Sequence, residues 1–330
     1  MWRSGLLWRS GLLWRSVVWL LLLACSRAPS SETPVVAAPV VKEVLPTLAP
    51  TPTEKPQPPT PTDPPACGKL EHACPIGFEC TPEGSCRQAN TKGGTQVWVP
   101  AGAFGMGCHI DQGLPCYPDE VPRHTVALSA FAIDETEVTV GDYRACVEAG
   151  ACTPPRTKAR VNRCTYVQKE ERLPVNCVTW FQANDFCLWV GKELPTEAQW
   201  EKASRGTQGL RYPWGMETID CSRANVFMPP RFCVGDPVKV GSYPTGRGPY
   251  GTLDQLGNLL EWTRDWYDAR YYYDSAEKDP LGPPQTGKRG LRGSSFSDAI
   301  RGGQYNSARY FLEPDTASAL VGFRCARTLE

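Results

Sequence analysis

The stretch from Thr179 to Gly206, TWFQANDFCLWVGKELPTEAQWEKASRG, carries the most consistent local signals in the chain. Thr179 and Gln182 have the spacing of a capping box, in which the hydroxyl accepts one N–H and the amide reaches back to another. Gly191 supplies a left-handed stop. Between them, apolar residues recur at helical spacing, and we expect these to form the buried face: Trp180, Phe181, Ala183, Phe186, Cys187 and Val190.

The same pattern repeats immediately afterwards. Pro195 fixes the entry to a second helix, Thr196 and Gln199 form a second capping box, and Gly206 ends it. Ala198, Trp200 and Ala203 line one face. Considered alone, the stretch predicts two short amphipathic helices of a protein core, without chemistry of their own.

The N-terminus has the features of an exported protein. Arg3, Arg9 and Arg15 precede the apolar run 17–23, and no acidic residue occurs before Glu32. We therefore predict a secretory signal peptide over residues 1–24, with an apolar region too short to span a membrane. Fifteen cysteines agree with an oxidising compartment. The 35 basic residues balance 35 acidic ones, so charge does not indicate a nucleic-acid partner.

Leu22–Cys25 resembles a bacterial lipobox, which implies cleavage before Cys25 and lipidation of its thiol. A multi-chain lipid anchor would attach the protein stably to a membrane. Ser26 follows the cysteine, and by the rule for Gram-negative lipoproteins this residue implies transfer to the outer membrane. The alternative is an ordinary cleaved signal with an incidental cysteine.

Residues 25–66 form a linker rich in Pro, Thr, Val and Ala, a composition that favours extended polyproline II structure. A small cysteine-rich module over residues 67–90 follows. About twenty residues cannot fold by burial alone, so we expect two disulfides, with the connectivity left open. Its cysteines are Cys67, Cys74, Cys80 and Cys86. Zinc is disfavoured because His72 is the only histidine there and no Cys-x-x-Cys spacing occurs.

The main domain covers residues 95–330. The segment Val97–Gly107 alternates like a strand pair about a glycine turn, and His124–Asp134 reads as one further alternating strand. Thr139 is placed to cap a helix that runs through Val147. Three cysteine pairs enclose short segments that they could close locally: Cys108 and Cys116, Cys146 and Cys152, Cys164 and Cys177.

Over roughly residues 95–328 the chain resembles the formylglycine-generating enzyme family, also called the sulfatase-modifying-factor domain. The matching strings, in family order, are VPAGAFGMG, HTVALSAFAIDETEVTVGDYRACV, PVNCVTWFQANDFCLWVGKELPTEAQWEKASRG, YPWG, GNLLEW and GFRCAR. The resemblance implies an α+β fold, a variant of the C-type lectin fold with much irregular structure. It also implies a disulfide between Cys187 and Cys325, which leaves Cys221 and Cys233 as a local pair.

The resemblance implies a calcium site at Asp254, Gly257, Leu259 and Glu261, where carboxylates and main-chain carbonyls would supply the oxygen ligands that the ion prefers. The alternative is a turn in which Glu261 accepts backbone N–H groups. A second family calcium site would use Asn225 and Val226, but its downstream ligand loop is replaced here by PPRFCVGD.

The family's copper-dependent oxidases hold Cu(I) with two cysteines after a Gly-Gly-Ser turn and oxidise a cysteine of a Cys-x-Pro-x-Arg segment to formylglycine. In this chain those positions fall near Asp298 and Gly303, and no cysteine occurs between Cys233 and Cys325. Neither a hydroxyl nor a carboxylate replaces thiolate for this soft ion. We therefore do not expect copper or the known oxidase reaction.

Residues that match or lie near the family's peptide groove persist: Trp262, Arg292, Ser295, Arg309 and Arg324. Trp262 and Arg324 could equally be structural, packing beneath the groove. We expect a pseudoenzyme that binds a peptide, protein or glycan of the cell envelope, with calcium as a structural cofactor. The alternative is a diverged oxidase or maturation enzyme that acts on exported proteins through an unrecognised centre.

Overall fold

The computed structural model describes residues 74–109, 116–156, 163–297 and 304–329 of the chain. The predicted signal peptide, the lipidation site Cys25, the linker and Cys67 lie outside these residues, as do Asp298 and Gly303. Within the described ranges, no helix has both the length and the apolar character needed to cross a membrane.

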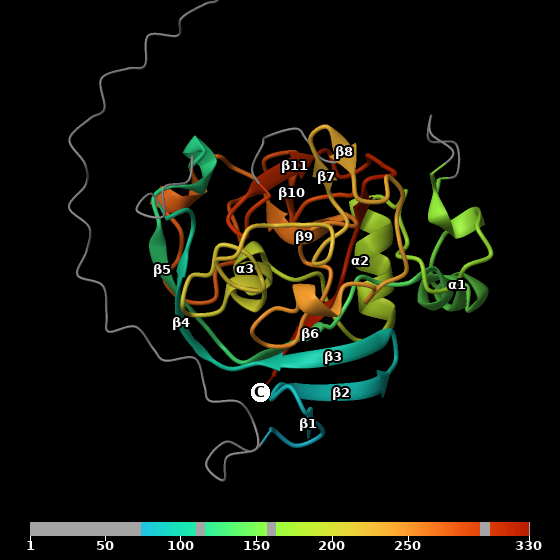
Figure 1. The fold of residues 1–330 in the computed structure, drawn as a ribbon, viewed down its shortest axis with the longest axis horizontal. Coiled ribbons are helices and arrows are strands. Elements are labelled where there is room, and N and C mark those ends of the chain that lie inside the picture. The colour runs from blue at the N-terminus through green and yellow to red at the C-terminus, as the bar shows by residue number, and fades with distance from the viewer. Residues whose placement is uncertain (1–73, 110–115, 157–162, 298–303, 330) are drawn as a thin grey trace, which may run out of the picture. The chain divides into compact units, whose positions relative to one another are not determined.

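The three α-helices are α1 (Val140–Glu148), α2 (Trp180–Trp189) and α3 (Glu197–Arg205) (Figure 1). Both predicted capping boxes form. At α2, the Gln182 N–H donates to the Thr179 hydroxyl over 3.2 Å and the Thr179 N–H donates to the Gln182 side chain over 3.0 Å. Gly191 follows with φ 74°, the left-handed value that glycine adopts without strain. The local signals therefore set where α2 begins and where the chain turns away.

The predicted buried face of α2 is wrong at one residue. Ala183, Phe186 and Cys187 are fully buried, but the Phe181 side chain is 47% exposed. Successive helical residues point about 100° apart, so Phe181 cannot follow Trp180 into the core. Trp180 takes the inward position and donates its indole N–H to the Thr263 carbonyl over 2.7 Å.

The larger sheet has five strands in the order β1-β2-β3-β6-β13. The predicted cysteine-rich module is part of this sheet, because β2 pairs with β3 in antiparallel fashion. The module is therefore continuous with the main domain. The strands are β1 (Glu79–Cys80), β2 (Cys86–Thr91), β3 (Gly94–Val99), β6 (Phe131–Asp134) and β13 (Ala326–Thr328).

The second sheet has four strands in the order β11-β10-β9-β12, with β12 parallel to β9 and the other pairs antiparallel. Two further pairs stand apart, β4 with β5 and β7 with β8. The strands are β4 (Gly102–Met106), β5 (His124–Leu128), β7 (Phe227–Met228), β8 (Arg231–Phe232), β9 (Leu260–Trp266), β10 (Arg289–Arg292), β11 (Arg309–Leu312) and β12 (Val321–Gly322). The short 3₁₀ turns are η2 (Pro118–Glu120), η3 (Thr165–Val167), η4 (Pro244–Gly246) and η5 (Tyr271–Tyr273).

Two strand predictions are wrong for the same reason. The expected strand pair in 97–107 is β3 and β4, which belong to different sheets, and the expected single strand in 124–134 is β5 and β6. The Lys202 ammonium donates to the Pro100 and Gly102 carbonyls over 2.7 and 2.9 Å, and the Ser129 N–H donates to Asp279 over 2.7 Å. These distant side chains hold the two crossings between sheets.

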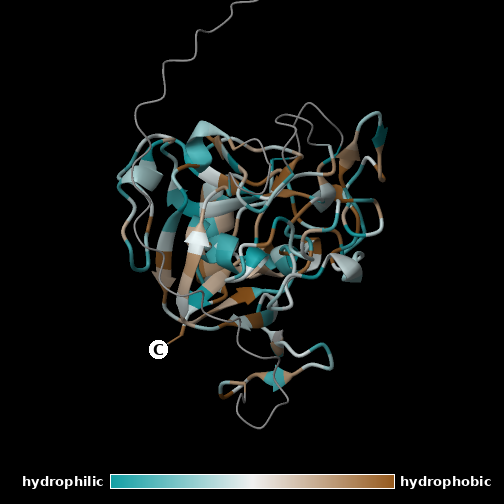
Figure 2. Cartoon of the chain, turned by 60° about the vertical axis from the view of Figure 1, so that its left-hand side comes forward, coloured by the Kyte–Doolittle hydropathy of each residue, from teal (hydrophilic) through white to brown (hydrophobic). Residues whose placement is uncertain are grey.

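The hydrophobic interior falls into two main clusters. One joins α1 and α2 to β9, β10 and β12, with Tyr143, Phe186 and Phe323 at its centre. The other lies between the β3–β6 pair, the β4–β5 pair and α3. Figure 2 shows hydrophobic residues, in brown, on several strands and connecting segments, with hydrophilic segments, in teal, interleaved among them.

Between described residues, the structure contains the five predicted disulfides of the main domain and the Cys74–Cys86 bond of the N-terminal hairpin. Cys187 of α2 is joined to Cys325, 138 residues away, and Cys74 is joined to Cys86. Cys80 is also disulfide-bonded. The remaining pairs, all short-range, are Cys108–Cys116, Cys146–Cys152, Cys164–Cys177 and Cys221–Cys233.

Candidate functional site

Every cysteine in the described part of the chain is disulfide-bonded. The segment Gly293–Phe296, which follows β10 and leads to the positions of the family's copper ligands, is buried and contains no cysteine. Two free thiolates are what a Cu(I) site needs. The described cysteines therefore cannot supply one without breaking a disulfide.

The residues predicted to line the groove lie in the interior. Trp262, Arg292, Ser295, Arg309 and Arg324 are each at most 1% exposed. Their side chains therefore cannot form the surface of an open groove, and that expectation needs correction. The structural role that the sequence left open for Trp262 and Arg324 is the one that their burial supports.

Arg292 and Arg309 fasten the second sheet to α3. The Arg309 guanidinium donates two hydrogen bonds to the Glu197 carboxylate, from Nε over 2.8 Å and from Nη2 over 3.1 Å. Arg292 pairs with Glu201, which also accepts a bond from Arg205 over 2.7 Å. Burial alone would raise the pKa of Glu201, but Arg292 and Arg205 lower it below its usual range. This network holds charged pairs in place between the second sheet and α3.

Arg324 and Glu261 form a second buried pair. The guanidinium binds both carboxylate oxygens, each over 2.7 Å, and the Trp200 indole N–H donates to the same carboxylate over 2.8 Å. Arg324 also donates to the carbonyls of Asp134, Glu135 and Leu253. The partners of Glu261 are thus side chains rather than the backbone N–H groups of the alternative weighed from the sequence.

The predicted calcium turn has a backbone suited to aiming oxygens at one point. Asp254, Gly257 and Asn258 adopt φ values of 59°, 86° and 61°, in the left-handed region. Among the described residues, none donates a hydrogen bond to the carbonyls of Gly257 and Leu259. Buried polar groups are normally paired, so two free carbonyls on one turn are consistent with cation ligands.

The charge around this turn is negative. Asp254, Glu261 and Glu137 are buried carboxylates, whereas Arg324 is the guanidinium that faces them. Burial, followed by repulsion from Asp254 and Glu261, raises the pKa of Glu137 well above its usual value. In the described part of the chain, no cluster of three or more Asp, Glu, His or Cys side chains could hold a metal ion. A calcium ion here would therefore depend on main-chain carbonyls for part of its shell.

The second predicted calcium position lacks a carboxylate. The Asn225 side-chain oxygen is buried without a partner, but the Val226 carbonyl accepts the Cys233 N–H over 2.9 Å. Asp236, the nearby acid, is exposed and its carboxylate lies 3.3 Å from Arg163. Among the described residues, this position therefore offers an amide oxygen but no free carboxylate to a cation.

A surface of aromatic and arginine side chains, which sequence reasoning did not identify, lies where YPWG meets the chain after the catalytic segment. Tyr212 and Trp214 stack with ring centroids 5.2 Å apart, and Tyr212 lies 6.0 Å from Tyr305. The Arg211 guanidinium lies over Tyr305 at 4.8 Å, and Arg223 lies 5.9 Å from the Trp214 ring. The Tyr212 ring is itself buried and supports the others. We call these five residues the aromatic–arginine surface.

The β7–β8 hairpin continues this surface. Gln304, the neighbour of Tyr305, donates to the Phe227 carbonyl over 3.0 Å, and the Phe227 and Phe232 rings lie 4.5 Å apart. Phe232 and Val234 are 50% and 56% exposed, which is high for large apolar side chains. Exposed apolar residues beside aromatic rings and arginines are typical of recognition surfaces.

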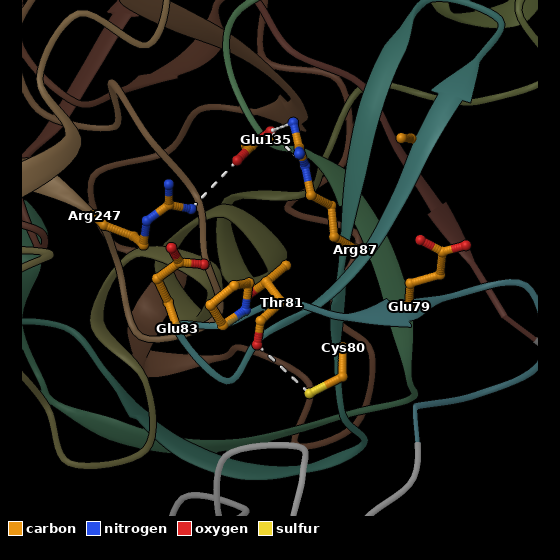
Figure 3. A pocket seen from close by; sticks show the side chains of 9 residues that line it. Glu79, Cys80, Thr81, Glu83, Arg87, Glu135 and Arg247 are labelled. Atoms are coloured by element: carbon orange, nitrogen blue, oxygen red, sulfur yellow. Dashed lines mark hydrogen bonds and ion pairs between the residues drawn. The ribbon is translucent and has the colours of Figure 1, made fainter.

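A pocket of about 370 Å³ lies between the β1–β2 hairpin and the main domain and is lined by residues of both (Figure 3). Glu135 sits between two guanidiniums there, 2.8 Å from Arg87 of the hairpin and 3.3 Å from Arg247. Both arginines therefore share one carboxylate of the main domain. This arrangement fastens the hairpin to the domain.

Comparison with known proteins identifies the relatives of this fold. The Sulfatase-modifying factor enzyme 1-like domain matches residues 82–329. The formylglycine-generating enzyme of Streptomyces coelicolor is 33% identical, over 74% of this chain and 92% of that protein. Among solved structures, PvdO from Pseudomonas aeruginosa superposes with a TM-score of 0.60 at 25% identity, over 71% of this chain and 94% of PvdO.

A further relative is larger than this chain. The serine/threonine-protein kinase Pkn1 of Chlamydia trachomatis is 35% identical over 71% of this chain, but the match spans only 38% of Pkn1. Both the fold expected from the sequence, an α+β variant of the C-type lectin fold, and the family are thus confirmed. The chain belongs to the sulfatase-modifying factor, or formylglycine-generating enzyme-like, family.

Proposed function

We propose that this chain is an exported binding module that has lost the copper oxidase reaction of its family and binds a peptide, protein or glycan of the cell envelope. One observation carries the proposal. The sequence has no cysteine between Cys233 and Cys325, and the described cysteines are all joined in disulfides. The scaffold is kept while the soft ligands that Cu(I) requires are missing.

The aromatic–arginine surface, extended by the β7–β8 hairpin, is the place where we propose that the ligand binds. Tyr305 and Gln304 directly follow positions 298–303, so this surface continues from the segment that carries the catalytic cysteines in the oxidases. Tyr, Trp and Arg are the residues that most often dominate binding energy at interfaces. The buried arginines Arg292, Arg309 and Arg324 stabilise the fold and do not contact the ligand in this proposal.

The oxidase reaction can be tested directly. Incubating the purified chain with Cu(I) and a Cys-x-Pro-x-Arg peptide should give no more aldehyde than the peptide with Cu(I) alone. The Streptomyces coelicolor enzyme, assayed in parallel, supplies the positive control. Copper-dependent aldehyde above the peptide background would refute the binding-only proposal and favour a diverged oxidase with an unrecognised centre.

We also propose that calcium binds the turn formed by Asp254, Gly257, Leu259 and Glu261. The two unpaired carbonyls and the excess of buried carboxylates support it. An ion that binds only the folded state stabilises it by about 2.7 kcal/mol at one hundred times its dissociation constant. For a domain of this size, each kcal/mol corresponds to roughly 2–4 °C in melting temperature.

Calcium added at saturation should therefore raise the melting temperature of the wild-type chain by roughly 5–10 °C over the chelated protein. Asp254→Asn should reduce that increase, because it removes a charged ligand. Asp236→Asn, a change to an exposed acid near the second position, should leave it intact. A melting temperature that does not respond to chelator would show that the turn is closed by its own hydrogen bonds.

Export and lipidation at Cys25 are part of the same proposal. Two features of the sequence support it. Residues 1–24 have the basic and apolar pattern of a signal peptide, and Leu22–Cys25, at its end, resembles a lipobox. Cells fed labelled palmitate should yield a labelled chain, and Cys25→Ala should abolish the label. Label that persists in the variant would place the modification elsewhere.

A further inference from the structure

Arg211 is a cation without an acidic partner on the aromatic–arginine surface. Among the described residues, no carboxylate pairs with it, and its Nε–H is buried without an acceptor. Its polar contacts are to two tyrosine hydroxyls: Nη2 donates to Tyr305 over 3.3 Å, and the side chain also bonds Tyr212. A guanidinium carries five N–H donors, so Arg211 keeps Nη donors that neither tyrosine uses.

Arg223 on the same surface is different. It pairs with Glu217, and its Nε lies 3.7 Å from Asp220. Both acids belong to the same short segment, so the charge of Arg223 is compensated locally. The contrast leaves Arg211 as the position on this surface where an incoming carboxylate would find an unshared guanidinium.

The tyrosine rings hold this guanidinium in place. Its central carbon lies 5.2 Å from the Tyr212 ring and 4.8 Å from the Tyr305 ring. The Arg211 carbonyl accepts the Asn306 N–H over 3.1 Å, which fixes the backbone beside Tyr305. A guanidinium that is already stacked loses less freedom when it binds, and its planar edge matches the two oxygens of a carboxylate.

The neighbouring surface favours a polypeptide over a sugar. Phe232, Val234 and Met216 expose half or more of their side chains. The Cys221–Cys233 disulfide ties the hairpin to the segment that follows YPWG. Such aliphatic and aromatic side chains bury the apolar side chains of a peptide, whereas they offer few hydrogen-bond partners to sugar hydroxyls.

We propose that Arg211 is the carboxylate-binding subsite for an acidic polypeptide whose apolar side chains pack on the β7–β8 hairpin. This inference rests on the proposed binding function and narrows its ligand to one chemical class. Charge-assisted, two-point hydrogen bonding to Arg211 would select Asp or Glu over their amides. The hairpin would add affinity that depends little on sequence.

The test uses two fluorescently labelled octapeptides, one alternating Glu and Leu and the other alternating Gln and Leu. Fluorescence anisotropy with the purified full chain should show at least tenfold tighter binding of the glutamate peptide, weakening as salt is raised. Arg211→Gln should lose at least tenfold in affinity for that peptide, and Arg211→Lys should lose less. Arg264→Gln, a control that removes an arginine of β9 outside this surface, should change affinity less than twofold.

Melting temperatures of the three variants within about 2 °C of wild type would show that the fold is intact. Equal affinity for the two peptides would overturn the carboxylate subsite but leave the binding module standing. Binding of an anionic polyuronate without binding of the glutamate peptide would overturn the polypeptide partner. The aldehyde assay remains the separate test of the proposed function, since its outcome does not depend on Arg211.

Discussion

Replacing Arg324 with methionine is expected to lower the free energy of unfolding by about 3–5 kcal/mol, the usual cost of removing one partner from a buried ion pair. The variant leaves the Glu261 carboxylate buried without its guanidinium and beside two further carboxylates, Asp254 and Glu137. It also leaves three main-chain carbonyls without their donor. Chemical denaturation of the wild type and the variant measures the difference.

Two comparisons separate the buried charge from a simple loss of contacts. Adding Glu261→Gln to the Arg324 variant should restore part of the lost stability, because the remaining side chain is then neutral. Arg264→Gln breaks a surface pair with Glu193, where both side chains are about half exposed, and should cost about 0–1 kcal/mol. If the Arg324 variant lost no more than the Arg264 variant, the buried pair would not support the fold.

Arg324 also shows where reading the sequence failed. Arginine near a family groove suggests a ligand contact, because arginine is charged and is usually found at the surface. Its burial depends on a partner 63 residues earlier, Glu261, and on three carbonyls contributed by two separate segments. The residues next to Arg324 in the sequence do not predict these contacts. The same long-range dependence hid Arg292 and Arg309, whose partners lie on α3.

The features that could be predicted are those whose partners are close in sequence. Each capping box joins residues three apart, and both form as predicted. The local disulfides close loops of 6–13 residues, so spacing alone suggested three of them. The aromatic–arginine surface could not be found in this way. Arg211 and Tyr305 are 94 residues apart, and only the short string YPWG marks one side of it.

Among the disulfides, the bond between Cys187 and Cys325 is expected to contribute most to the stability of the fold. Replacing both with alanine should lower the free energy of unfolding by about 2–5 kcal/mol, because the bond restricts the unfolded chain over a long loop. The sequence separation is 138 residues, against 6 for Cys146–Cys152. On the loop-entropy relation, the long bond should contribute about 3 kcal/mol more than the short one.

The matched control is therefore the double alanine variant of Cys146 and Cys152, another pair at the buried end of a helix. Equal losses in the two double variants would mean that packing around the sulfur atoms, rather than loop length, determines the effect. A larger loss for the long bond is favoured by what surrounds it. The Cys325 N–H donates to Asp134 over 2.8 Å, and Asp134 pairs with Lys192, just beyond α2, over 2.7 Å.

That chain of contacts gives the disulfide a second consequence. The disulfide holds the end of α2 against β6 and β13. Arg324 is adjacent to Cys325, just before β13 begins. Losing the bond should therefore weaken the Arg324–Glu261 pair as well, so the two sets of variants should not be additive. A triple variant of Cys187, Cys325 and Arg324 that loses less stability than the sum of its parts would demonstrate this coupling. Simple additivity would show that the bond acts only on the unfolded chain.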